Sequence, residues 1–200
     1  MTDNDEKNAV LNAKGYCSKN FSFEDFISCS ETSQNISVEN VPRLETSYKF
    51  IKSLANDILE PCLAKFGNLK LTYGFCGEKL SRAIKKGNGG IHPPLDQHAG
   101  MELNANGNLI CPRGGMAADF HCLPISSLQV AKFVVGELPF DRLYYYGEDR
   151  PIHVSINSKP SSQIVIMRKV NIRVVPQRIN SDAFLSLQGD MAYSLRDVFQ

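Results

Sequence analysis

The sequence has no long apolar run and no strong charge bias, and each absence argues against a class of function. No apolar run within its 200 residues approaches the roughly 20 that cross a bilayer. Lys and Arg number 22 against 21 Asp and Glu, a net charge of +1. Overall charge therefore does not favour nucleic acid, a membrane surface or another polyanion as partner. Partner choice must come from a local site.

Two further absences concern targeting and cysteine pairing. The polar, acidic opening MTDNDEKNAVLNAKGYCSKN has no apolar core, so it does not resemble a signal peptide, and we expect a cytoplasmic protein with a flexible tail over 1–20. The six cysteines show no CxxC spacing. In a reducing compartment this indicates free, mostly buried thiols rather than disulfides or a zinc ribbon.

The patterns that are present indicate an α+β domain with a small, mainly antiparallel sheet and helices packed on one side. The clearest is an amphipathic stripe predicting a helix over 44–67, bent near Pro61 and ended by Gly67. We expect the main domain over 21–160 and a strand and helix extension, 161–200, packed on it. Further helices are predicted over 21–35 (a short turn), 77–86, 125–138 and 181–199, a loop over 87–94, and strands over 69–75, 116–122, 141–146, 151–156 and 164–175.

The stretch LDQHAGMELNANGNLICPRGGMAADF, residues 95–120, holds an imidazole and a carboxylate separated by a long spacer. Within the spacer, Asn106-Gly107 between two apolar segments predicts a β-hairpin over 101–112. The ends of a hairpin lie close together, so His98 and Asp119 can still meet in space. With His153 on a later strand they offer two imidazoles and one carboxylate, a donor set that suits a catalytic zinc ion.

Several segments, in order, resemble the M15 peptidase family, the D-Ala-D-Ala carboxypeptidases and L-alanyl-D-glutamate endopeptidases that share the Hedgehog/DD-peptidase fold. The likeness covers roughly 21–157. The family motif Ser-x-His-x-x-Gly-x-Ala-x-Asp is similar to DQH at 96–98 plus GMAADF at 115–120, and its later FDQ and Trp-x-His-x-Ser strands are similar to FDRL at 140–143 and IHVS at 152–155. Upstream, LANDILEPCLAKFG and LTYGFCG resemble a family helix and its Ser-Gly-Tyr-Arg segment.

The resemblance implies that His98, Asp119 and His153 hold one Zn²⁺. It also implies hydrolysis of peptide or peptide-like amide bonds, with peptidoglycan stem peptides as substrate and a phage-like lysin released by lysis as context. Zinc would lower the pKa of bound water toward roughly 7 and polarise the carbonyl under attack. Without a gap in the alignment, the motif histidine falls instead on Pro112, which would describe a metal-free relative.

The chain departs from the family at the substrate-binding arginine, whose position holds Cys76. Arg82 or Arg113 could replace this cation, and His92 could line the cleft or be structural.

It also departs at the general base, whose aligned position holds Tyr146. Glu148, favoured over Asp149, could serve as base, since a carboxylate near bound water can accept and return a proton. The alternative is that both are solvated turn residues. Tyr146 could donate a hydrogen bond to a developing oxyanion.

These departures leave an alternative function, a cytosolic divergent or inactive relative that binds a peptide-like or anionic partner, nucleotide or nucleic acid included. A basic strip would serve such a partner, although a solvated strand face explains the same residues: Arg168, Lys169, Arg173 and Arg178. His121 could support the metal group or be an ordinary half-buried histidine. A thiolate site built on Cys111 or Cys122 has no identifiable third group. The sequence does not determine the oligomeric state.

Overall fold

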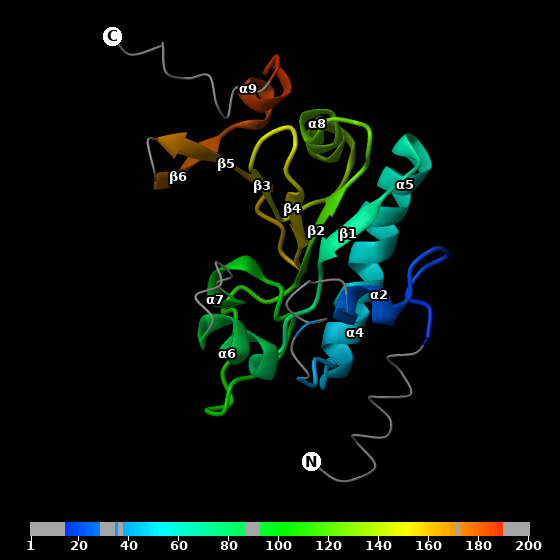
Figure 1. Ribbon diagram of the computed structural model, residues 1–200, viewed down its shortest axis with the longest axis vertical. Coiled ribbons are helices and arrows are strands. Elements are labelled where there is room, and N and C mark those ends of the chain that lie inside the picture. Colours follow the sequence, from blue (N-terminus) through cyan, green and yellow to red (C-terminus); the bar gives the residue numbers. More distant parts are fainter. Residues whose placement is uncertain (1–14, 29–34, 36–37, 87–92, 171–172, 190–200) are drawn as a thin grey trace.

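The computed structural model describes residues 15–28, 35, 38–86, 93–170 and 173–189 (Figure 1). Its centre is an open six-stranded sheet with the order β1-β2-β4-β3-β5-β6. Neighbouring strands are antiparallel except β3 and β5, which run parallel. The predicted α+β class with a mainly antiparallel sheet is confirmed. The strands are β1 (Lys70–Tyr73), β2 (Met116–His121), β3 (Arg142–Tyr145), β4 (Ile152–Ile156), β5 (Gln163–Val170) and β6 (Arg173–Ile179).

The predicted helix over 44–67 is a continuous rod along one face of the sheet (Figure 1). It comprises α4 (Glu45–Leu54), a π-helical turn η1 (Ala55–Leu59) and α5 (Glu60–Phe66). The π turn ends at Leu59, two residues before Pro61, which has no N–H for the regular hydrogen-bond ladder. Gly67 follows the last turn with φ 84°, a conformation that glycine adopts without steric cost.

Strand alternation divides the sheet into two different faces. One face packs against α4 and against α8 (Ser127–Glu137), and its side chains are almost fully buried: Met116, Ala118, Phe120, Leu143, Tyr145, Ile152, Val154, Ile164 and Ile166. The residues between them project from the opposite face, because successive side chains of a strand alternate. We call this opposite side the open face. It carries Asp119, His153 and their neighbours.

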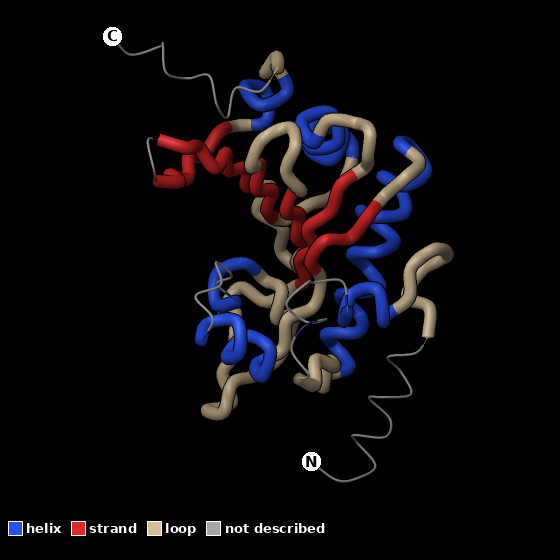
Figure 2. The backbone as a smooth tube through the Cα atoms, viewed as in Figure 1, coloured by secondary structure: helices blue, strands red, loops and turns tan. Residues whose placement is uncertain are grey.

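Smaller helices complete the architecture. The predicted turn near the N-terminus is α2 (Phe23–Ser28), and the predicted helix over 77–86 is α6 (Glu78–Lys86). The helix α7 (Pro93–Asp96) borders the open face, since Leu95 O accepts a hydrogen bond from Arg142 Nη1 at 3.4 Å. Figure 2 shows the strands as one band, with α4 and α5 on one side and α6 and α7 away from them.

Three sequence expectations need correction. The single strand expected over 164–175 is an antiparallel hairpin of β5 and β6, which the sequence hides because this run has neither glycine nor proline. The loop expected over 87–94 ends earlier, because Pro93 begins α7, and proline is favourable in a first helical turn; residues 87–92 lie outside the described ones. The helix expected over 181–199 is α9 (Ser181–Leu185), and 190–199 lie outside the described residues.

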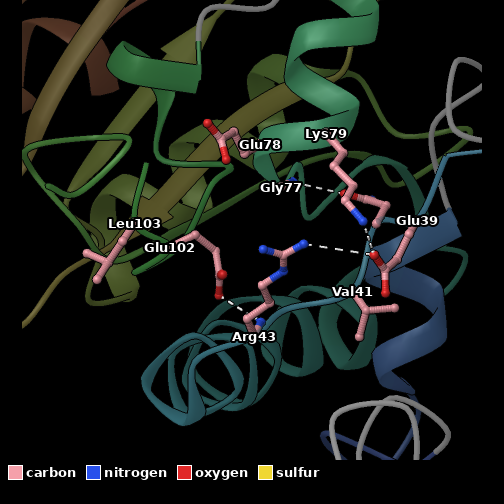
Figure 3. A pocket seen from close by; sticks show the side chains of 9 residues that line it. Glu39, Val41, Arg43, Gly77, Glu78, Lys79, Glu102 and Leu103 are labelled. Carbon is pink, nitrogen blue, oxygen red and sulfur yellow. Dashed lines mark hydrogen bonds and ion pairs between the residues drawn. The ribbon is translucent and has the colours of Figure 1, made fainter. Parts of the chain in front are cut away.

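The expected hairpin over 101–112 closes as predicted. Leu103 and Leu109 form an antiparallel bridge, and Gly107 in the turn has φ 77°. The buried Glu102 fixes this segment to the start of α4. Its Oε1 accepts from the backbone N–H of Arg43 at 3.0 Å (Figure 3), and also from the N–H of Leu44, the residue before the helix, at 3.1 Å. A carboxylate at a helix start satisfies otherwise unpaired N–H groups. The insertion therefore caps the main helix.

Among the described residues, no helix is long and apolar enough to cross a membrane. The expected free, buried thiols are confirmed for the cysteines that the structure describes: Cys17, Cys62, Cys76, Cys111 and Cys122.

Candidate metal centre

The predicted ligands meet on the open face. Asp119 and His153 are direct cross-strand partners on β2 and β4, and His98 reaches them from the loop after α7. Asp119 Oδ1 lies 2.8 Å from His153 Nδ1 and 3.3 Å from His98 Nε2. One donor atom from each residue falls within 4.8 Å of the others. The group could therefore hold one metal ion.

The orientation of His98 is set by the backbone. Its Nδ1 lies 2.7 Å from the carbonyl oxygen of Gly74, an arrangement in which Nδ1–H donates and Nε2 is the ring nitrogen that faces Asp119. The loop is also tied to the end of β1, because Cys76 N donates to His98 O at 2.9 Å. The ring contact leaves Nε2 as the nitrogen that can bind a metal ion after losing its proton, and the backbone contact fixes the position of the residue.

Gln97 anchors the same loop through a buried polar network. Its Nε2 donates to Gly114 O at 2.8 Å and to Asp141 Oδ2 at 3.1 Å, and its Oε1 accepts from Ser155 Oγ at 2.9 Å. Gln97 is fully buried and has φ 64°, a conformation that is unfavourable for a residue with Cβ. These bonds hold the neighbouring His98 over the sheet.

The three side chains stabilise a negative charge on Asp119 and a positive charge on His98. Burial raises the pKa of Asp119, but the two adjacent imidazoles outweigh it and hold that pKa far below its ordinary value. Burial likewise lowers the pKa of His98, and the carboxylate of Asp119 outweighs this effect and raises it. Without an ion, the cluster is therefore held together as an imidazolium–carboxylate pair.

The donor atoms fit a divalent ion. A tetrahedral zinc ion with bonds of about 2.0–2.1 Å keeps its ligand atoms roughly 3.3 Å apart, which matches the His98–Asp119 separation of 3.3 Å. The separation of Asp119 Oδ1 from His153 Nδ1 is 2.8 Å, a hydrogen-bond distance that must lengthen by about 0.5 Å if both atoms are to bind one ion. In addition, His153 Nε2 is buried and has no hydrogen-bond partner among the described residues. An orphaned ring nitrogen is unusual in a buried histidine whose only role is structural.

The predicted substrate-binding residues lie in different environments. Arg113 donates to both carboxylate oxygens of Asp141 and to Lys159 O, while Arg82 pairs with Glu78 on the exposed side of α6. Their roles in substrate binding stay predictions. His92 lies outside the described residues. Cys76 is buried, and burial raises the pKa of its thiol to about 12; a cysteine has no cationic form that could supply the positive charge of an arginine.

Among the predicted catalytic residues, Tyr146 interacts electrostatically with one of the metal ligands, Asp119. Burial raises its pKa, and the negative charges of Asp119 and Asp96 add to the effect.

The carboxylates of the following turn have no such link. Glu148 is half-buried and its carbonyl accepts from Ser127 N at 3.0 Å, whereas Asp149 is exposed. No contact between either side chain and the metal-ligand group is found in the described part of the chain, so the choice of base stays a prediction. His121 is half-buried, and burial lowers its pKa.

Sequence reasoning missed the residues that support the ligands. Tyr144 packs edge-on against His153 with ring centroids 4.9 Å apart, and Tyr73 does the same against His98 at 4.7 Å. The alternation in DRLYYY places Arg142 and Tyr144 on one face, a signal that could have been used. The contacts of Gln97 depend on residues far away in the chain.

Comparison of the chain with protein-family models, with curated proteins and with solved structures finds no match. The chemistry is therefore inferred from the geometry of the site.

Proposed function

We propose that the protein is a zinc-dependent hydrolase of peptide or peptide-like amide bonds, a divergent relative of the M15 peptidases with the Hedgehog/DD-peptidase fold. The observation that carries this proposal is the convergence of His98, Asp119 and His153, whose donor atoms lie within 4.8 Å of one another. Two imidazoles and one carboxylate leave a fourth tetrahedral position free, as catalytic zinc sites require.

When bound, zinc supplies Lewis acidity that lowers the pKa of coordinated water and polarises a carbonyl. The residues of the chain orient the ligands and bind the substrate. Gly74 O and the Gln97 network orient His98, and the Tyr144 ring shields His153. We propose that Tyr146, which lines the groove beside Tyr144, donates a hydrogen bond to charge that develops on the substrate oxygen.

Substrate class follows from the resemblance alone. We propose peptide-like substrates of the peptidoglycan stem type, and Glu148 or Asp149 as the base that accepts the proton of the attacking water. A phage-type lysin would meet this substrate after lysis.

The test combines metal content with turnover. Purified protein should contain one equivalent of zinc, which is lost in His98→Ala and in His153→Ala. The matched control is His121→Ala, because His121 lies on the same strand as Asp119 but outside the group. Zinc-loaded protein should cleave a muropeptide panel, and a chelator should stop this cleavage. Stoichiometric zinc without any cleavage refutes the hydrolase, and absence of zinc binding refutes the metal site as well.

A second candidate is a relative that binds a peptide-like or anionic partner without catalysis. The observation in its favour is the uncharged, buried Cys76 at the position of the family arginine. It predicts ligand binding that is unchanged when zinc is removed.

A further inference from the structure

One cross-strand ladder on the open face connects the metal-ligand group with the edge of the sheet. Asp119 pairs with His153, and His153 pairs with Tyr144. Tyr144 pairs with Val165 across the parallel strands, and Val165 pairs with Arg178 on β6. Paired residues project from the same face of a sheet. Arg178 therefore lies on the same face as the metal ligands, three strands away from His153.

A groove follows this ladder. Its volume is about 500 Å³, and it is lined by residues of α7, β3, β5 and β6, among them Tyr144, Tyr146, Val165, Arg142 and Arg178. The groove is adjacent to the metal-ligand group, because the Tyr144 ring lines the groove and packs against His153. Its volume falls in the range of small-ligand sites.

Two arginines line this groove and form no ion pair in the described part of the chain, although the carboxylate of Asp96 also lines it. Arg142 donates to the carbonyl oxygen of Leu95 at 3.4 Å. Arg178 faces the side-chain amide of Gln163, whose oxygen, in its favourable orientation, accepts from Arg178 Nη2 at 3.2 Å. Gln163 is also the cross-strand partner of Arg142, so the three residues are neighbours on the open face, and all three line the groove. We call them the Arg142–Gln163–Arg178 cluster.

Two other arginines of the described chain differ from this cluster in having an acidic partner. Arg113 is bound to Asp141 and Arg82 to Glu78, so carboxylates neutralise both guanidinium groups. The arginines of the cluster keep donors and charge available toward the groove. A guanidinium in this state suits the bidentate binding of a carboxylate.

We propose that the groove binds an extended acidic segment of the substrate, with its carboxylate at the Arg142–Gln163–Arg178 cluster and the amide to be cleaved at the metal-ligand group. This assignment rests on the proposed function and adds a substrate class to it. From β4 to β5 there are two strand spacings, about 10 Å, which an extended peptide covers with about three residues. The preferred peptide therefore carries Asp or Glu about three residues from the cleaved bond.

Binding of short peptides tests the proposal without relying on turnover. The probes are two fluorescein-labelled hexa-alanine peptides, one with a single Glu and one with Gln at the same position, added to zinc-loaded protein. Fluorescence anisotropy should show about tenfold tighter binding of the Glu peptide, the size expected for a charge-assisted contact. Arg142→Gln and Arg178→Gln should each reduce this preference severalfold. The matched control Arg173→Gln, an exposed position of β6 outside the groove, should keep it.

Several outcomes overturn the proposal. They are equal or undetectable binding of the two peptides to the wild type, and a Glu preference that survives in both arginine variants. Displacement of the peptide by inorganic phosphate at concentrations where acetate has no effect overturns the carboxylate assignment. His153→Ala separates the two proposals: a variant without zinc that retains the Glu preference leaves the groove assignment standing, even if the wild type hydrolyses nothing.

Discussion

Gly115, at the start of β2, should tolerate no side chain. A Cβ at this position would lie 2.0 Å from the carbonyl oxygen of Ile156 and 3.0 Å from Nε2 of Gln97. The nearer neighbour is backbone, which cannot rotate away as a side chain can, so β2 and β4 must separate by about 1 Å or more in the variant Gly115→Ala. An alanine would also strain the backbone there, because φ is 87°, a conformation that only glycine adopts readily.

Gly107→Ala is the matched control, since Gly107 has φ 77° and a Cβ added there would meet nothing within 4 Å. Left-handed backbone alone costs roughly 1–2 kcal/mol, and overpacking adds roughly 1–3 kcal/mol. Thermal unfolding should therefore show a clear loss for Gly107→Ala and about twice that loss for Gly115→Ala. Zinc affinity should fall only in Gly115→Ala, because Gln97 positions His98. Equal losses of stability in both variants would refute the steric reasoning.

Three further predictions concern the metal centre. The pKa of His98 is raised above its ordinary value of 6.5 to about 9, so zinc must displace a proton from its imidazole. Zinc affinity should therefore increase about tenfold per pH unit below that pKa. Competition with a chelator over a pH series measures this dependence, and an affinity that does not change with pH contradicts it. Gln97→Leu removes three hydrogen bonds and should lower zinc affinity about 10- to 100-fold. Calorimetric titration with zinc measures this loss, and unchanged affinity would exclude a positioning role for Gln97. Glu148→Gln should lower kcat on a cleaved muropeptide by about 10²-fold or more with zinc content unchanged, while a loss confined to Asp149→Asn would move the base to that residue.

The parts of the site that were predictable depend on local signals. The Asn106-Gly107 turn has a strong sequence signature, and the structure closes a bridge between Leu103 and Leu109 around it. A closed insertion leaves its flanks adjacent, so the approach of His98 to Asp119 followed from the sequence.

The parts that were not predictable depend on register between distant segments. The position of Arg178 beside Val165 requires the parallel pairing of β3 with β5 and the β5–β6 hairpin, and neither leaves a local pattern in the sequence. The same holds for Glu102. Its carboxylate accepts from the N–H of Leu44 at the start of α4, and Leu44 precedes Glu102 by 58 residues in the chain. Such contacts are set by the packing of the whole domain.

Localisation of the ion in a zinc-soaked crystal is the most direct test of the metal centre. Anomalous scattering at the zinc edge should show one ion per chain within about 2.0–2.2 Å of His98, Asp119 and His153. An ion bound elsewhere, or none at these three residues at saturating zinc, would contradict the proposed metal centre.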